Sequence, residues 1–182
     1  MKQNQQDIFT NLYQEHSSYL YAVCLRYTRN KEDAEDIMQE GFLKIYHALD
    51  NFKRESNIKT WMQRIMINTA INHYRKKKKT DFYNINIDDA EIFKLENNDA
   101  INQLSTDELL NVINKLPDGY RMVFNLYSIE GYKHKEIAEI LDIKEGTSKS
   151  QLAKARITIQ KLIEKELGIK QQNIQYSNIE NG

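Results

Sequence analysis

The stretch HKEIAEILDIKEGTSKSQLAKAR, residues 134–156, has the pattern of a helix, a tight turn and a second helix. Apolar residues recur at helical spacing on both sides of the turn: Ile137, Ala138 and Leu141, then Leu152, Ala155 and Ile159. The turn is expected at residues 142–144, where Ile143 can fill the gap between the two helices. In a helix-turn-helix module the second helix presents its polar face to the major groove of DNA. The stretch therefore predicts DNA binding, with an ordinary helical hairpin as the alternative.

The composition of the whole chain favours an all-α protein. Its 182 residues include only one proline and six glycines, and 40% are apolar, which is enough for a hydrophobic core. Cys24 is the only cysteine, which excludes an intramolecular disulfide, and its apolar neighbours predict a buried thiol. No segment approaches the roughly 20 apolar residues of a membrane helix. We therefore expect a cytoplasmic protein without membrane contact of its own.

The net charge of zero conceals an uneven distribution of charged side chains. Residues 1–80 carry 14 basic and 9 acidic side chains, and residues 109–182 carry 11 basic and 9 acidic ones. Between them, residues 81–108 carry one lysine and 8 acidic side chains. Two basic blocks thus flank an acidic connector, so the neutral overall charge does not argue against nucleic-acid binding.

Periodicity predicts three helices in the N-terminal block, at residues 7–28, 30–51 and 59–77. Asn30 is a good N-cap for the second helix, and acidic residues follow it in the first turn, where the helix dipole favours them. The residues expected on the buried side of the first helix are Ile8, Phe9, Leu12, Tyr13, Leu20, Val23, Cys24 and Tyr27. Together the three helices can bury one shared core.

The chain divides into two helical domains in this interpretation. The first spans residues 1–80, and residues 81–104, rich in Asn, Asp and Glu, form a flexible acidic linker. Ser105 and Glu108 form a capping-box pattern that opens the second domain, residues 105–168. Residues 169–182 are expected to be a disordered tail.

The segment from Lys53 to Lys79 is strongly basic, with Glu55 as its one acidic residue. Its aromatic residues are interleaved with the charges, and Phe52 precedes it directly. Such a segment attracts phosphates and offers bases a stacking surface. The alternative is a solvated helix end. With a helix-turn-helix in the same chain, nucleic-acid contact is favoured.

A second candidate surface lies in DAEDIMQEGFLKIY, residues 33–46. Helical spacing places several acidic and amide side chains on its exposed face. A polar, acidic face suits docking of a basic partner protein better than acid–base chemistry, with a solvated face as the alternative. Glycine-rich phosphate loops, nucleophile elbows and H-E-x-x-H motifs are absent from the sequence, and the four histidines lack ligand spacing. We expect neither catalysis, nor a metal site, nor a cofactor.

These segments, in this order, resemble those of a bacterial RNA polymerase sigma factor of the extracytoplasmic-function (ECF) group of the sigma-70 family. Residues 33–46 resemble the region 2 helix that docks on the polymerase clamp. Residues 52–79 resemble the segment that recognises and melts the −10 promoter element, and residues 116–156 resemble region 4, which reads the −35 element. The resemblance implies core RNA polymerase and promoter DNA as partners. It also allows an anti-sigma factor as a third partner.

The resemblance assigns roles to individual residues of this chain. The polymerase-docking positions are Asp36, Gln39 and Glu40. The candidate −10 contacts are Asn68, matching the position that captures a flipped base, and Phe52, Lys59, Asn72 and Arg75 on the same surface. The candidate −35 contacts are Lys149, Ser150, Gln151 and Lys154.

The recognition helix departs from the family pattern at two positions. Ser148 stands where Val is usual, and Gln151 stands where a basic residue is common. These two positions are where we expect the promoter preference of this chain to be determined. Three alternatives remain: a regulator that binds DNA without polymerase, an RNA-binding or interaction protein, and a nucleic-acid enzyme. The first two leave the docking helix without a role, and the third lacks metal ligands at workable spacing.

Overall fold

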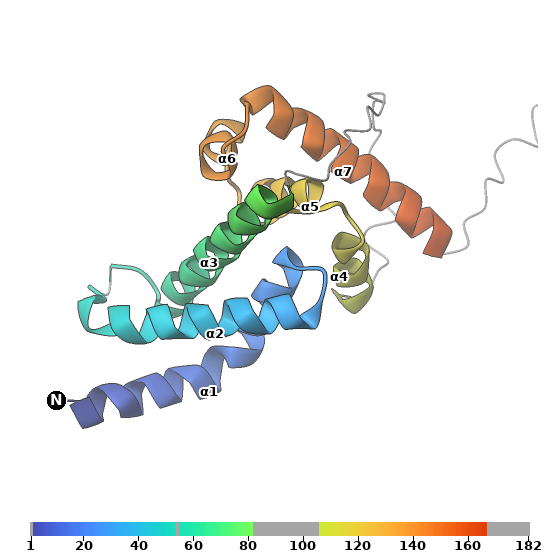
Figure 1. Cartoon of the computed structure of the whole chain (residues 1–182). Helices are drawn as coiled ribbons and strands as arrows, with labels where there is room; N and C mark the ends of the chain where they lie inside the picture. Colours follow the sequence, from blue (N-terminus) through green and yellow to red (C-terminus); the bar gives the residue numbers. More distant parts are fainter. Residues whose placement is uncertain (1, 54, 82–105, 167–182) are drawn as a thin grey trace, which may run out of the picture.

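The computed structural model describes residues 2–53, 55–81 and 106–166 (Figure 1). Its N-terminal helices are α1 (Lys2–Tyr27), α2 (Lys31–Ala48), the short 3-10 turn η1 (Leu49–Asn51) and α3 (Ile58–Asp81). Its C-terminal helices are α4 (Thr106–Asn114), α5 (Asp118–Phe124), the π-helical turn η3 (Asn125–Ile129), α6 (His134–Leu141) and α7 (Glu145–Glu166). These three ranges contain no strand, so the predicted all-α class is confirmed. The predicted linker, apart from Asp81, and the predicted tail lie outside the described residues.

The predicted helix boundaries hold where a capping signal exists. Asn30 caps α2, since its side-chain oxygen accepts a hydrogen bond from the Asp33 backbone N–H at 2.7 Å. By contrast, α1 begins at Lys2, five residues before the predicted start. Residues 2–6 are Lys, Gln and Asn, and without apolar periodicity they gave no signal, although Lys and Gln are strong helix formers.

Helices α1, α2 and α3 pack against one another around a buried core. The Cys24 thiol lies in this core, as predicted. Two of the residues predicted to be buried on α1 are not: Ile8 is 45% exposed and Tyr13 is 44% exposed. Both lie in the N-terminal half of α1, where the apolar side of the helix extends past the core.

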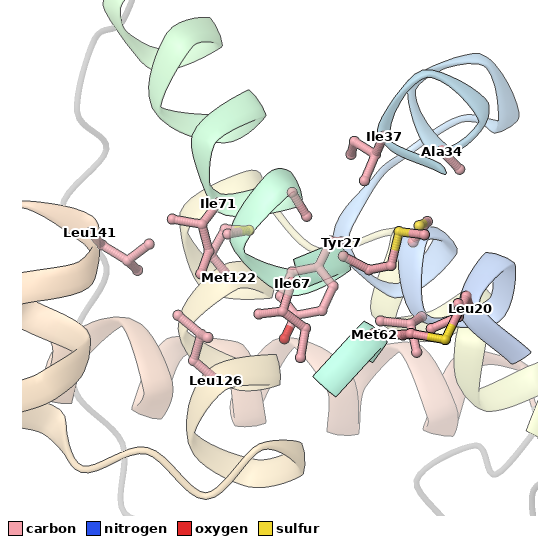
Figure 2. Close-up of a cluster of buried hydrophobic side chains, with 14 of the residues drawn as sticks. Leu20, Tyr27, Ala34, Ile37, Met62, Ile67, Ile71, Met122, Leu126 and Leu141 are labelled. Carbon is pink, nitrogen blue, oxygen red and sulfur yellow. The ribbon is translucent and has the colours of Figure 1, made fainter. Parts of the chain in front are cut away.

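The C-terminal helices share this core rather than forming a wholly separate one. Figure 2 shows side chains of α1, α2 and α3 together with Met122 of α5, Leu126 of η3 and Leu141 of α6. A second, smaller cluster is formed by Val112, Leu116, Ala155, Ile159 and Ile163. Within the described residues, the N-terminal helical set (α1, α2 and α3) and the C-terminal helical set (α4 to α7), which the sequence assigns to separate domains, are therefore in direct contact.

The predicted helix-turn-helix forms at the expected place. Asp142 ends α6 in the left-handed conformation, with φ 53°. Ile143, in the turn between α6 and α7, is half-buried and packs against the core. The side chains of Leu152, Ala155 and Ile159 are buried, as the periodicity indicated. Within the described ranges, no helix is long and apolar enough to cross a membrane.

Candidate nucleic-acid interface

An exposed polar ridge runs along α3. Arg64, Asn68, Asn72 and Lys76 follow one another at four-residue intervals, and all four are exposed. The spacing places them on one side of the helix, while Met62, Met66 and Ala70 on the other side are buried. The structure thus brings two predicted −10 residues, Asn68 and Asn72, onto one accessible face.

The other predicted −10 residues lie at the two ends of α3. At its N-terminal end, the half-buried Phe52 ring packs on Trp61 with centroids 4.9 Å apart. The ammonium of Lys59 lies 3.8 Å from the centre of the Tyr19 ring, in cation–π geometry. Both residues are therefore near the ridge but have structural contacts of their own.

At the C-terminal end of α3, Arg75 contacts the helix-turn-helix. Its guanidinium donates hydrogen bonds to the backbone oxygens of Ile140 and Glu139 at the end of α6. Unpaired carbonyls at a helix C-terminus favour such a cation. Arg75, Lys78 and Lys79 also line an open cavity of about 580 Å³, together with Glu139 and Asp142. In this arrangement Arg75 contacts protein where the sequence predicts contact with DNA.

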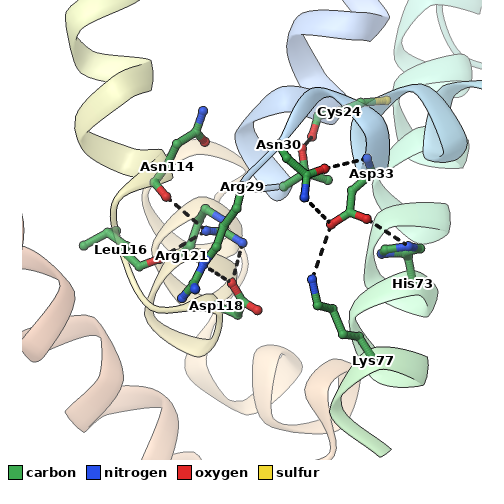
Figure 3. A network of polar contacts seen from close by, with 11 residues as sticks. Cys24, Arg29, Asn30, Asp33, His73, Lys77, Asn114, Leu116, Asp118 and Arg121 are labelled. Carbon is green, nitrogen blue, oxygen red and sulfur yellow. Dashed lines mark hydrogen bonds and ion pairs between the residues drawn. The ribbon is translucent and has the colours of Figure 1, made fainter. Parts of the chain in front are cut away.

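Two further members of the basic segment stabilise the packing of α3 on α2. The Asp33 carboxylate lies 3.4 Å from the Lys77 ammonium and 3.9 Å from the His73 ring nitrogen (Figure 3). The same carboxylate accepts a hydrogen bond from the amide of its N-cap residue, Asn30. Part of the basic segment therefore contacts the protein itself. Neither DNA binding nor a solvated helix end, the two alternatives from the sequence, includes this contact.

The predicted −35 residues occupy the first half of α7. Lys149 is exposed and pairs with Glu145 one turn earlier at 2.7 Å, an interaction that lowers the pKa of Glu145. The hydroxyl of Ser150 donates to the Thr147 carbonyl, and Lys154 is half-buried. The Gln151 amide lies against Gly119 of α5, and a methyl group at Gly119 would come 3.1 Å from it. Lys149 is therefore the most accessible of the four.

Ser148 does not lie on the face that could meet DNA. Its exposed fraction is 0%, and its hydroxyl is hydrogen-bonded to Nδ1 of His134 at 2.9 Å. Ser148, where the sequence predicts that promoter preference is determined, therefore has no exposed surface of its own to contact DNA. Valine, the usual residue of the family at this position, also suits a buried site. Helical periodicity could have indicated this burial, because Ser148 precedes the buried Leu152 by four residues.

The predicted docking residues lie beside an apolar groove between α1 and α2. Asp36 and Gln39 are exposed and line a cavity of about 560 Å³, whereas Glu40 points toward α3 and pairs with Lys44 at 2.7 Å. The apolar lining consists of Phe9, Tyr13, Met38, Phe42 and Leu43. Leu43 is 58% exposed. Helical periodicity assigns Phe9 and Tyr13 to the core and does not indicate this groove, although Gln39 and Leu43 share one face of α2 by their i, i+4 spacing.

Largely buried charges join the two helical sets. The Glu130 carboxylate, just after η3, accepts hydrogen bonds from Arg26 at 3.0 Å, from the Tyr27 hydroxyl at 3.5 Å and from the Gln63 amide at 3.0 Å. The Asn125 amide donates to the Arg26 carbonyl at 2.6 Å. Glu130 thus fixes the start of the helix-turn-helix to both α1 and α3.

A second polar contact between the two helical sets is made by Asp118. This carboxylate bridges Arg29 at 2.8 Å and Arg121 at 2.7 Å (Figure 3). Arg121 is buried and also donates to the Leu116 carbonyl, and desolvation lowers its pKa. The contact between the two sets therefore combines apolar burial with directed ion pairs.

Comparison with known proteins identifies the family of this fold. Residues 12–80 match the model of sigma-70 region 2, and residues 100–159 match the model of sigma-70, region 4. ECF RNA polymerase sigma factor SigW of Bacillus subtilis is 34% identical over 176 residues, covering 88% of this chain and 91% of that protein. The chain belongs to the ECF RNA polymerase sigma factors. ECF RNA polymerase sigma-E factor of Escherichia coli is 33% identical to this sigma factor, covering 70% of this chain and 72% of that protein.

A solved structure has the same fold. The sigma factor RpoE of Bartonella quintana, in complex with the anti-sigma factor NepR, aligns with a TM-score of 0.50 and 23% identity. The alignment covers 86% of this sigma factor and 96% of that chain. Family membership makes this sigma factor a non-catalytic transcription initiation factor, as the sequence predicted. The exposed ridge of α3 lies in region 2, and α7 up to residue 159 lies in region 4.

Proposed function

We propose that this sigma factor binds core RNA polymerase in the cytoplasm, reads the −35 element with α7 and the −10 element with α3, and stabilises the opened DNA. Residues 1–80 then act in polymerase docking and −10 recognition, and residues 105–168 in −35 recognition. The observation that carries the proposal is the exposed ridge of α3. Asn68 and Asn72 lie on this ridge, while the opposite side of the helix is buried in the core. An amide can donate to and accept from the edge of an unpaired base.

The groove between α1 and α2 supports polymerase docking. Its floor is aromatic and aliphatic, and Glu35, Asp36 and Gln39 line it as well. An apolar floor beside carboxylates fits an amphipathic helix that carries basic residues next to its apolar side. We assign this groove and the adjoining face of α2 to the polymerase clamp. Glu40 then contributes by pairing with Lys44 beside the groove rather than by lining it.

Capture of unpaired bases requires a surface for stacking as well as hydrogen bonds. The Phe52 and Trp61 rings lie at the N-terminal end of the α3 ridge, and Lys59 is exposed beside them. A base flipped out of the duplex costs a few kcal/mol of stacking and pairing, which such contacts offset. The ridge of α3 would therefore trap the −10 strand after it opens.

The contact between the two helical sets must be released when both promoter elements are bound. Elements centred near −35 and −10 lie roughly 25 base pairs apart, or about 85 Å along the duplex at 3.4 Å per base pair. In the structure Arg75 of α3 touches α6, so the C-terminal end of α3 adjoins the helix-turn-helix. The 24 residues from 82 to 105 could span about 80 Å when extended. We infer that the described arrangement is a closed form, which opens on the polymerase.

An anti-sigma factor is a further proposed partner, because the related Bartonella quintana sigma factor was solved with one. A protein that stabilised the contacts of Glu130 and Asp118 would hold this sigma factor closed. Its presence is not needed for the promoter-binding proposal.

Transcription reconstituted with core polymerase tests the proposal. The template would be a promoter located by mapping start sites after overexpression of the chain. We expect initiation there only when the chain is added to the core enzyme, and weak or no binding of the chain alone to the duplex. Tight binding of the chain alone, with no effect on the polymerase, would indicate a stand-alone regulator and contradict the proposal.

A further inference from the structure

The packing of α7 on the rest of the helix-turn-helix depends on a buried polar contact. Ser148 lies in the second turn of α7 and is completely buried, so its hydroxyl has no access to water. Its side chain meets Nδ1 of His134, the first residue of α6, at 2.9 Å. A buried hydroxyl without a hydrogen-bond partner is costly, so Ser148 makes α7 dependent on His134.

The His134 ring is itself held in place by an aromatic stack. It lies on the Tyr127 ring of η3 with centroids 4.5 Å apart and planes inclined by 21°. The guanidinium of Arg156, also on α7, lies 5.9 Å from the centre of the same Tyr127 ring. Ser148 and Arg156 are eight residues apart, or about 12 Å along α7. The two rings therefore connect to α7 at two points separated by about two turns.

The position of this cluster links it to −35 recognition. Lys149 and Ser150, both candidate −35 contacts, directly follow Ser148 on α7. Base edges are distinguished by hydrogen bonds of defined geometry, so a small rotation of the helix changes which side chains reach them. The cluster thus acts on the part of α7 that the proposed function assigns to the promoter.

We propose that His134 and Ser148 are positioning residues that set the orientation of α7 in the major groove, and so determine −35 preference without touching DNA. This inference rests on the proposed function, since it needs α7 to read the −35 element. Ser148 then acts on promoter preference through its hydrogen bond with His134 and not through contact with DNA. Tyr127 keeps the His134 ring in the plane that its hydrogen bond requires.

Two single variants and their combination test the inference. His134→Phe keeps a ring to stack on Tyr127 but leaves the Ser148 hydroxyl without a partner. Ser148→Ala removes the hydroxyl, so it needs no partner from residue 134. Each variant, and His134→Phe/Ser148→Ala, would be assembled with core polymerase and assayed on templates that share one −10 element and carry a randomised −35 element. The relative transcription from each −35 sequence is the readout.

We expect His134→Phe to reduce transcription from the preferred −35 sequence about tenfold and to change the order of preference among sequences. Adding Ser148→Ala should restore transcription to within about twofold, because no buried hydroxyl is then unpaired. If His134 instead bound a DNA phosphate directly, Ser148→Ala would give no rescue, and the inference would be overturned. An unchanged order of preference in His134→Phe would overturn it equally. A wild-type holoenzyme indifferent to the −35 sequence would overturn the proposed function itself.

Melting temperatures of the variants separate positioning from folding. A merely structural defect lowers the melting temperature and reduces transcription from all −35 sequences by a similar factor. A positioning defect changes the order of preference while the protein remains folded at the assay temperature. Uniform loss across all templates, accompanied by unfolding of His134→Phe and not repaired by Ser148→Ala, would overturn the inference.

Discussion

At the scale of single residues, Cys24 shows how burial changes chemistry. Burial raises the pKa of its thiol to about 12, from a usual value near 9. The unfolded thiol ionises near 9 while the folded one stays protonated. The contribution of Cys24 to stability is therefore present below pH 9 and falls as the pH rises above it.

We predict that Cys24 resists alkylation at pH 8 in the folded protein, because the reactive thiolate is absent there. In denaturant the same thiol should react at the rate of a free cysteine. The measurement is mass spectrometry after timed treatment with iodoacetamide. Equal rates in the folded and denatured protein would show that the thiol is accessible and contradict its burial.

Asn68 provides the residue-scale prediction for function. Asn68→Ala removes a side chain that makes no buried contact, so the protein should fold normally. Transcription from a −10-dependent promoter should fall about tenfold or more, as expected for loss of a base contact worth about 1–3 kcal/mol. Asn111→Ala, an exposed asparagine on α4, is the matched control and should leave transcription unchanged. Equal transcription by the two variants would remove Asn68 from the −10 surface.

At the scale of helices, Gly41 allows α2 to approach α3 closely. A methyl group at residue 41 would collide with the thioether end of Met66, a fully buried side chain that would have to change its conformation inside the core. We predict that Gly41→Ala lowers the free energy of unfolding by about 1–3 kcal/mol through overpacking. Gly146→Ala in the first turn of α7 is the control, since nothing lies within 4 Å of a methyl group there. Urea denaturation should show Gly146→Ala unchanged or about 0.5 kcal/mol more stable. Similar stability of both variants would contradict the close packing of α2 on α3.

The sequence predicted the helices better than it predicted their contacts. Asn30 and the left-handed turn at Asp142 carry local signals, so the boundaries they mark agree with the structure. The first turn of α1 carries no apolar pattern and was missed. Periodicity shows which side of a helix is buried but not which partner covers it. The sharing of one core by α3, α5 and α6 was therefore not predictable from the sequence.

In the candidate sites, too, the sequence indicated which residues are exposed but not which partners the others contact. Asn68, Asn72 and Lys149 are exposed, as their helical positions suggested. The family resemblance assigns Arg75 to DNA, but its guanidinium contacts the C-terminal end of α6. Ser148 and Glu130 are polar residues whose partners lie far away in the sequence, so no sequence pattern names those partners. Ser148 is buried and the Glu130 side chain is 10% exposed, and a specific partner, His134 or Arg26, satisfies each of them.

At the scale of the whole molecule, Glu130 stabilises the closed form. Its carboxylate is the common acceptor for α1 and α3, and its replacement leaves Arg26 in a largely buried site without a counter-charge. We predict that Glu130→Ala weakens the contact between the two helical sets by about 3 kcal/mol. Small-angle scattering should show a larger radius of gyration for Glu130→Ala than for the wild type. The control Glu15→Ala, at a carboxylate exposed on α1, should leave the radius unchanged. An unchanged radius for Glu130→Ala would mean that apolar packing alone holds the sets together.

Energy transfer between the two helical sets tests most directly whether the closed form opens to read a promoter. Donor and acceptor dyes would be attached through Glu15→Cys on α1 and Lys161→Cys on α7, both exposed sites. Cys24 should remain unlabelled because it is buried. We predict efficient transfer in the free protein and a large loss of transfer when core polymerase and promoter DNA are added together. Transfer that stays high in a transcriptionally active promoter complex would contradict the separation of the −10 and −35 readers.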